Sequence, residues 1–405
     1  MPSRIQYGAG SLTQVGVLAK LWGNKALIVS DLMMQKNGLV ERCSQYLSEA
    51  GIEYVSYCGV NTEPTTKHVD EIVAICEAEG CNLFIALGGG SCIDAAKAAA
   101  VLMTNRGQLS SYTFTGGHRF QSEALPLIAI PTTAGTGSEV TKVTVIIDTD
   151  SQVKMMIAQP QLLPKAAIVD AELSMTCPSS VVASSGVDAL CHAIEAYLSR
   201  KAQPATDVWA LQAIQRIYRH LPKVYHKQAS TEDYEQVALG AMLAGAAFSN
   251  ASVTLIHGMS RPIGALFHVP HGISNAMLLP AVLTFMASKT ASKRLADIHT
   301  MLIQQERVRD VAGARAQAGG EQEDYASAII HAVKSLCRSL GIGNLNDYGI
   351  DRELYRKAIP KMVSDAMDSG SPANCPFDVT REDIEQLYHV CFDYMYGDDL
   401  QELII

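Results

Sequence analysis

The sequence predicts an α/β fold with two domains, one built on an amino-terminal parallel sheet and one made of carboxy-terminal helices alone. Three observations predict it. The chain has 405 residues, which suits two domains that each bury a core. Apolar runs of strand length alternate with helical periods as far as residue 169. After Cys177 and Pro178 nearly every segment has helical spacing, so we expect domains at residues 1–178 and 179–405.

The first domain alternates strands and helices. We expect strands at residues 25–30, 53–58, 82–87, 125–130 and 166–169, and helices at residues 38–50, 65–79 and 93–103. This alternation is typical of a parallel sheet with helices on both faces. Residues 143–158 interrupt it, because two apolar runs flank the polar stretch 148–151, and this pattern predicts a hairpin.

The second domain is expected to be a helical bundle. Helical spacing covers the 180s to 190s and residues 204–220, 231–260, 273–287, 290–305, 324–340, 352–366 and 381–395. The uncharged run 236–260 is long enough to cross a bilayer, but its serines, Asn250, Thr254 and His257 favour a buried helix. Residues 304–323 are charged and rich in alanine and glycine, which predicts a solvated loop or a loosely held insertion without a function.

Composition narrows the class of partner. The net charge is −9 and no basic cluster occurs, so neither a nucleic acid nor an acidic membrane is expected to bind. A small molecule is the expected partner. The amino terminus MPSRIQYGAGSL lacks the apolar core of a secretory signal, and the 10 cysteines form no CxxC pair. These features predict a cytoplasmic protein.

Two segments of the second domain, residues 186–195 and 257–271, predict a divalent-metal site. Asp188 and His192 are four residues apart, a spacing that places both side chains on one face of a helix. His257 and His271 could complete a ligand set. For any one histidine alone, a core position with a backbone hydrogen bond is the alternative. Residues 236–288 contain no Asp, Glu or Lys and a single arginine, Arg261. Histidines and an arginine buried in so apolar a segment would require a hydrogen-bond partner, an opposite charge or a metal ion.

Two loops of the first domain predict a dinucleotide site. Residues 88–91 (GGGS) follow a strand and open a helix, so backbone amides and the helix dipole can meet a pyrophosphate. The loop lacks the GxGxxG spacing, and a tight β-to-α turn is the alternative. Residues 131–139 (PTTAGTGSE) also leave a strand and offer hydrogen-bond donors. Asp31, at the end of the first strand, can accept hydrogen bonds from a ribose or cap a helix.

The motifs GVDALCHAIEA, HGMSRPIGA and PHG (residues 270–272) resemble the signatures of the iron-containing (group III) alcohol dehydrogenases, over nearly the whole chain. The resemblance implies the architecture shared with dehydroquinate synthase, a dinucleotide-binding domain followed by an all-helical metal-binding and catalytic domain. It implies that Fe²⁺, or alternatively Zn²⁺, is bound by Asp188, His192, His257 and His271, and that His268 is not a ligand. It also implies that the pyrophosphate meets Gly89, Gly90 and Ser91, and that the rest of the cofactor path is lined by Thr132, Thr133, Thr141, Val145, Lys154 and Leu173.

The same resemblance bears on the choice of cofactor and on the proton relay. Asp31 matches a position associated with a preference for NAD over NADP. Glu63 stands where Asn is usual in the family, and its charge also disfavours NADP. Arg261 stands where many members have a histidine, and because arginine cannot exchange protons, the relay would pass through water, His268 or the cofactor ribose.

The expected activity is reversible hydride transfer between NAD(H) and a small primary or secondary alcohol or aldehyde, whose oxygen binds the metal. In an alternative, Arg261 binds the anionic end of a semialdehyde or of a phosphonate- or sulfonate-bearing aldehyde. Arg261 could instead be structural, paired with an acidic residue of another helix or with carbonyls at a helix end. Glycerol dehydrogenase-like and dehydroquinate synthase-like enzymes and a non-enzymatic carrier are further alternatives. The family also implies a homodimer or larger homo-oligomer, and the extended residues 4–9 could pair across a sheet edge.

Overall fold

The computed structural model describes residues 1–113, 116–151, 153–303 and 325–394. By its internal contacts the chain divides into two compact units. The sheet unit contains residues 1–178 and 229–249, and the helical unit contains residues 179–228 and 250–405. The predicted solvated loop at 304–323 lies outside the described residues.

The sheet unit is built on six parallel strands in the order β1-β8-β5-β4-β2-β3. Their bounds are β1 (Arg4–Tyr7), β2 (Lys25–Val29), β3 (Glu53–Tyr57), β4 (Leu83–Gly88), β5 (Leu127–Pro131) and β8 (Ala166–Val169). Every residue of the central strand β4 is buried, as expected for a strand covered on both faces. The predicted parallel sheet is confirmed.

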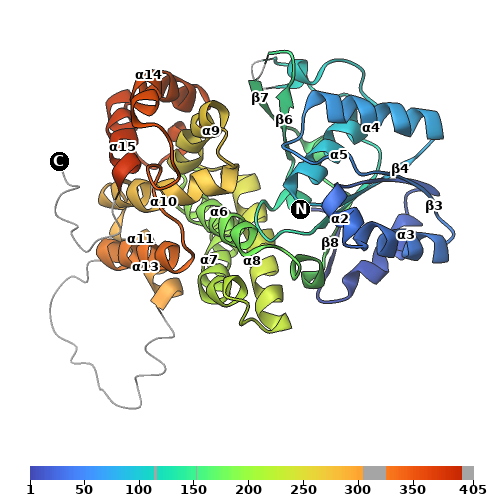
Figure 1. Cartoon of the computed structure of the whole chain (residues 1–405), viewed down its shortest axis with the longest axis horizontal. Coiled ribbons are helices and arrows are strands. Elements are labelled where there is room, and N and C mark those ends of the chain that lie inside the picture. Colours follow the sequence, from blue (N-terminus) through green and yellow to red (C-terminus); the bar gives the residue numbers. More distant parts are fainter. Residues whose placement is uncertain (114–115, 152, 304–324, 395–405) are drawn as a thin grey trace. The chain divides into compact units, whose positions relative to one another are not determined.

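Helices cover both faces of this sheet (Figure 1). Along β2, Ala26 and Ile28 pack against α1 (Val15–Ala19), α2 (Leu32–Lys36) and α3 (Leu39–Glu49). Leu27 and Val29 point to the opposite face and pack against α4 (Thr66–Glu79) and α5 (Gly90–Leu102). This alternation follows from the two-residue period of a strand and explains why the strands read as continuous apolar runs.

Shorter elements complete the sheet unit. The predicted hairpin is present as antiparallel β6 (Val143–Asp148) and β7 (Val153–Ala158). Ile146 and Ile157 of this hairpin join the core on the α5 side. Single 3₁₀ turns lie at Ser11–Gln14, Leu109–Tyr112, Ser138–Val140, Pro160–Leu162 and Ala171–Ser174.

Helix α8 (Thr231–Ala251) was expected in the second domain, but most of it belongs to the sheet unit. Two contacts account for this. The backbone amide of Ala9 donates to Oε1 of Glu235 over 2.8 Å. A Cβ on Gly245 would lie 2.7 Å from the Cα of Gly137, so the absence of a side chain lets the helix touch the loop at residue 137. The helical spacing of apolar residues could not predict either contact, because each joins residues far apart in the sequence.

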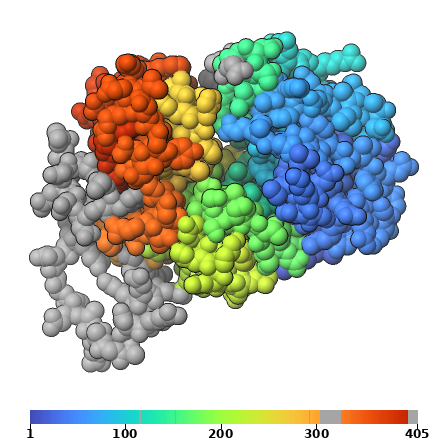
Figure 2. Space-filling model, in the orientation of Figure 1, coloured from blue at the N-terminus to red at the C-terminus, as the bar shows by residue number. Residues whose placement is uncertain are grey.

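The helical unit contains only helices and one 3₁₀ turn (Pro372–Asn374) among its described residues, as predicted. Its helices are α6 (Ser179–Leu198), α7 (Pro204–Tyr225), α9 (Leu255–Phe267), α10 (His271–Ser288), α11 (Ser292–Ile303), α13 (Tyr325–Ser339), α14 (Arg352–Asp368) and α15 (Arg381–Asp393). In the space-filling view, α14 and α15 form one continuous area of surface, coloured orange to red (Figure 2).

The single helix predicted over residues 231–260 is wrong. The helix is interrupted at residues 252–254, where Ser252 has a φ of 68°. The axes of α8 and α9 are bent by 102° relative to each other across this interruption. No described helix alone has the length and apolarity to cross a membrane, although the bent pair α8 and α9 together meets those two criteria. Because of this interruption a new helix, α9, starts at Leu255, and His257 therefore lies in its first turn.

Candidate functional site

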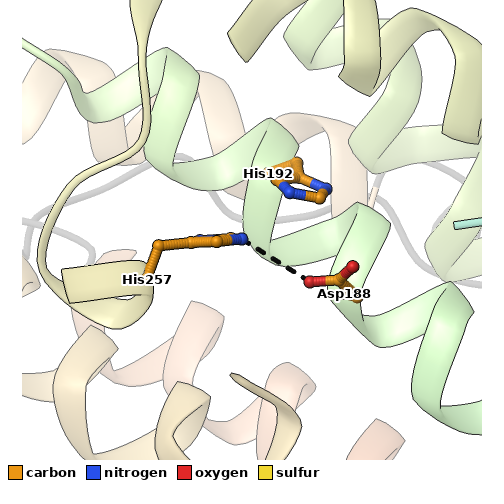
Figure 3. A group of neighbouring side chains, drawn as sticks. All are labelled: Asp188, His192 and His257. Atoms are coloured by element: carbon orange, nitrogen blue, oxygen red, sulfur yellow. Dashed lines mark ion pairs between the residues drawn. The ribbon is translucent and has the colours of Figure 1, made fainter. Parts of the chain in front are cut away.

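Three of the predicted metal ligands meet in the helical unit. Asp188 and His192 lie one turn apart on α6, and His257 lies on the first turn of α9. One ligand atom from each lies within 4.8 Å of the others, and all three side chains are buried. Figure 3 shows them pointing toward one another from two helices, with His257 Nε2 3.5 Å from Asp188 Oδ1. We refer to Asp188, His192 and His257 as the buried triad.

His271, the fourth predicted ligand, lies beside the buried triad at the start of α10. Its Nε2 atom is 4.0 Å from Asp188 Oδ1, and its ring meets the ring of His257 edge to face at 5.3 Å. It lies outside the group of three whose ligand atoms are all within 4.8 Å of one another, and its side chain is partly exposed. His268 ends α9 in a left-handed conformation and is exposed, away from this group.

Glu195 is a site residue that the sequence reasoning missed. It lies on α6 seven residues after Asp188, hence on the same face of the helix, and its side chain is fully buried. One carboxylate oxygen forms a short hydrogen bond with Nδ1 of His257. Its position inside the quoted motif GVDALCHAIEA was the available signal, because the i, i+4, i+7 spacing aligns it with both predicted ligands of α6.

Asn275 is the second missed residue. It lies one turn after His271 on α10 and is fully buried. Its Nδ2 atom lies 2.6 Å from Asp188 Oδ1, 3.1 Å from His257 Nε2 and 3.2 Å from His271 Nε2. An amide nitrogen only donates, so Asp188 Oδ1 accepts from it, and all three atoms lie around this one nitrogen. The spacing of four from His271 was the signal for it.

The electrostatics of this cluster favour a positive charge. Burial alone would raise the pKa of Asp188, but His192, His257 and His271 outweigh it and hold that pKa below its ordinary value. Burial would lower the pKa of His257, but Glu195 and Asp188 raise it to about 9. One carboxylate and several imidazoles at these separations fit a divalent ion of the Fe²⁺ or Zn²⁺ type.

Arg261 lies on α9 one turn after His257, so both side chains leave the same face of the helix. Its Nη1 atom donates to Oγ of Ser371 over 3.1 Å. Burial lowers the pKa of Arg261, and the negative charge of Glu195 opposes this effect. The charge of an acidic residue on another helix, Glu195 of α6, thus reaches the arginine.

The two predicted cofactor loops lie together in the sheet unit. Gly89 precedes α5 as its N-cap, and Gly89, Gly90 and Ser91 are partly exposed at the amino terminus of that helix. A Cβ on Gly90 would lie 2.7 Å from a carbon of Thr136, so the second loop packs directly on the first. Thr132 is buried, and its hydroxyl has no hydrogen-bond partner among the described residues. These features fit a bound pyrophosphate and its neighbouring ribose.

Three of the other predicted cofactor residues, Asp31, Val145 and Lys154, already have protein partners. The Asp31 carboxylate caps α2 by accepting the backbone amides of Met33 and Met34 at 2.8 and 2.9 Å. Lys154 pairs with Glu63 over 2.7 Å, so the unusual acidic residue has its charge compensated. The remaining positions lie as follows: Thr133 is partly buried on the second loop, Leu173 is buried in a 3₁₀ turn, and the Val145 amide donates to Asp94.

Thr141 belongs to a buried polar cluster that sequence reasoning did not find. The Lys97 ammonium, on α5, donates to the hydroxyls of Ser138 and Thr141 and to the carbonyl of Val143 over 2.8 to 3.0 Å. Burial lowers the pKa of Lys97 to about 8, while Asp94 and Glu139 act in the opposite direction. The cluster ties α5 to the second loop and to the hairpin.

Comparisons with known proteins identify the family of the chain. Two family models match the chain, iron-containing alcohol dehydrogenase over residues 2–171 and the carboxy-terminal domain of the Fe-containing alcohol dehydrogenase family over residues 182–392. The NAD-dependent methanol dehydrogenase of Bacillus methanolicus is 32% identical over 390 residues, covering 96% of this chain and 97% of the relative.

Solved structures are also similar. The crystal structure of 1,3-propanediol oxidoreductase matches with a TM-score of 0.88 and 32% identity, covering 96% of this chain and 98% of that one. The sulfoacetaldehyde reductase from Bifidobacterium kashiwanohense, in complex with NAD⁺, matches with a TM-score of 0.81 and 26% identity over 97% of this chain and 98% of that one.

Proposed function

Because this chain belongs to the iron-containing alcohol dehydrogenase family, we propose that the buried triad and His271 bind its divalent ion, and that the two glycine-containing loops bind its NAD. The chain is an NAD-linked oxidoreductase that interconverts small alcohols and aldehydes. The observation that carries the site assignment is the buried triad, in which one carboxylate and two imidazoles converge within 4.8 Å.

The roles of the chain's own groups follow from this arrangement. An ion bound by the triad and His271 supplies Lewis acidity toward an alcohol or aldehyde oxygen. Asp188 contributes the negative charge, and the imidazoles contribute neutral nitrogen ligands that leave room for a substrate. Asn275 donates to Asp188 Oδ1 over 2.6 Å and so orients that carboxylate.

In the sheet unit, the backbone amides of the partly exposed residues at the start of α5 would bind the pyrophosphate, and the Thr132 hydroxyl would gain the partner that the described chain does not supply. Thr133, Thr141, Val145, Lys154 and Leu173 would line the rest of the path. Asp31 would disfavour a 2′-phosphate and so favour NAD over NADP.

Turnover is the direct test of the proposed function. Protein loaded with Fe²⁺ should oxidise NADH in the presence of short aldehydes, followed by absorbance in the NADH band, and chelation of the ion should abolish the reaction. A protein that binds NADH and the ion but consumes no NADH with any aldehyde would be a carrier, and the proposal would fail.

Arg261 supports a narrower substrate class, aldehydes with an anionic end. On α9 it follows His257 by four residues, and that rise of about 6 Å is comparable to the length of a short aldehyde whose oxygen lies near His257. A guanidinium binds carboxylate, phosphonate or sulfonate groups in a bidentate manner. The similarity to a sulfoacetaldehyde reductase favours the same class.

Specificity constants for charged and neutral aldehydes distinguish binding of the anionic end by Arg261 from a structural role of Arg261. Arg261→Gln should depress kcat/KM for succinic semialdehyde selectively over kcat/KM for butanal, by about 1.5 to 3 kcal/mol, the usual strength of a charged hydrogen bond. Arg294→Gln, which breaks a salt bridge to Asp207 elsewhere in the helical unit, is the matched control. Equal losses for both aldehydes in Arg261→Gln would assign the arginine a structural or general catalytic role.

We also propose that the chain works in the cytoplasm as a homodimer. All ten cysteines fall in the described residues and are free thiols, which suits a reducing compartment. Strand β1 is the last strand at one end of the sheet, so a second copy could pair along it.

A further inference from the structure

Glu195 is buried among hydrogen-bond donors. Its Oε1 atom accepts from the backbone amide and the hydroxyl of Thr254 at 3.0 and 2.8 Å, and from the backbone amide of Ile256 at 2.8 Å. The backbone amide of His257 is 3.4 Å from the same oxygen. The other oxygen, Oε2, bonds to Nδ1 of the His257 ring. One carboxylate of α6 therefore holds both the start of α9 and the side chain of His257.

These contacts replace a missing local cap. Thr254 is the N-cap residue of α9, yet its side chain caps no backbone amide of the helix. The first amides of a helix have no partner within the helix and must find one elsewhere. Glu195 supplies it from α6, and its negative charge is favourable at the positive end of the helix dipole. The break between α8 and α9 is thereby fixed in position.

The same carboxylate selects the tautomer of His257. An ionised carboxylate only accepts, so Nδ1 must carry the proton that it donates to Glu195. When the ring gives up its other proton as an ion binds, Nε2 bears the lone pair, and Nε2 is the atom 3.5 Å from Asp188 Oδ1. A ring that could rotate or change tautomer would present a proton instead of a lone pair to an ion.

We propose that Glu195 is the positioning residue of the metal centre, because it locks the ring and tautomer of His257 and so sets how tightly the ion is held. The inference rests on the proposed ligand set. In this proposal Glu195 is not a ligand of the ion, because its two oxygens accept from Thr254, Ile256 and His257, and its effect passes through His257. Carboxylate partners of this kind change metal affinity by about 10- to 100-fold when they are removed.

The test compares zinc affinity in Glu195→Gln with that of the wild type, by competition with a chromophoric chelator. Glutamine keeps the shape and an oxygen that can cap α9, but its amide group would face Nδ1–H of His257 with a donor and favour the wrong tautomer. We expect zinc to bind roughly 10- to 100-fold more weakly. Wild-type zinc affinity in a folded Glu195→Gln protein would overturn the proposal.

Asp170→Asn is the matched control. Asp170 is also a buried carboxylate, and it accepts the backbone amides of Gly10, Leu12 and Glu172 at 2.9 to 3.1 Å in the sheet unit. This variant should lose thermal stability and keep wild-type zinc affinity. An equal loss of zinc affinity in both variants would mean that general destabilisation, and not His257, is responsible, which would also overturn the proposal.

A measurement on the wild type keeps the inference testable if Glu195→Gln does not fold. Nitrogen NMR of the zinc-loaded protein should show His257 protonated at Nδ1, and the opposite tautomer would overturn the proposal. Asp188→Ala separates this inference from the ligand assignment. If Asp188→Ala retains zinc, the ligand set fails. If it loses zinc while Glu195→Gln retains it, only the role of Glu195 fails.

Discussion

Asp188 is the residue on which most of the site converges. Its Oδ1 atom faces the Nε2 atoms of His257 and His271 and the amide nitrogen of Asn275. At 2% exposure this carboxylate would be costly without such partners. Side chains this tightly coupled are expected to act as one unit, so changing one should affect the function of all.

Alanine at Asp188, His192 or His257 should lower metal content and turnover together, because each substitution removes a group that would bind the ion directly. Metal analysis of the purified variants, with kcat/KM for one aldehyde, checks this. His268→Ala is the control for metal content, since His268 is exposed and lies outside the group. A full metal complement in His257→Ala would refute the ligand assignment.

Asp31→Gly should narrow the preference for NADH over NADPH, because it removes the charge that would repel a 2′-phosphate. Glycine also replaces the N-cap of α2, at a cost of only a few tenths of a kcal/mol. Asp31→Asn retains the cap and removes the charge, so both variants should shift the ratio of specificity constants alike. A ratio equal to that of the wild type in both variants would place Asp31 away from the ribose.

Among the elements, the loop after β5 depends on buried charges. Lys97 on α5 holds this loop through Ser138 and the hairpin through Val143. Ser138 in turn donates to Asp94 over 2.5 Å. Buried polar groups with complete hydrogen bonds make an element rigid, and a rigid loop suits a cofactor site.

Glu139 should make the stability of this loop depend on pH. Burial raises the pKa of Glu139 from 4.5 to about 7, although its backbone hydrogen bond and Lys97 oppose the change. Between these two values the folded chain binds more protons than the unfolded chain, so the free energy of unfolding falls as pH rises through the window.

Glu139→Gln should therefore flatten the pH dependence and stabilise the protein above this window, by on the order of 3 kcal/mol. Denaturant unfolding at a series of pH values measures this. The exposed Glu123→Gln should leave the profile unchanged. A Glu139→Gln profile parallel to that of the wild type would show that Glu139 ionises as it does in the unfolded chain.

For the whole molecule, the edge of the sheet at β1 is a candidate site for association of two chains. Among the described strands, β1 ends the sheet beside β8, so its outer edge is where a second chain could pair. Light scattering should give twice the chain mass of 43.6 kDa, or a larger multiple. Ile5→Pro, which removes one backbone donor of β1, should weaken the association. A mass of one chain for the wild type at working concentration would refute the homodimer.

Local sequence patterns predicted the fold class and most of the elements, and three motifs carried the resemblance to the family. Strand alternation such as Ala26 and Leu27 is local, and so are the i, i+4 pair Asp188 and His192 and the glycines that open α5. Patterns of this kind depend on neighbours a few residues apart, so they can be recognised before the chain is folded. The resemblance of the motifs to iron-containing alcohol dehydrogenases is confirmed by both family models.

Contacts between distant parts of the chain set where α8 packs, where it ends, and which residues support the proposed metal centre. Gly245 draws α8 to the sheet unit through a contact with Gly137, more than a hundred residues away. Glu195 on α6 accepts backbone amides in the first turn of α9 and holds the ring of His257, although 62 residues separate Glu195 from His257. Such contacts leave no periodic trace in the sequence, because each joins two elements whose separation along the chain is arbitrary. Their energy depends on burial and geometry, which exist only once the chain has folded.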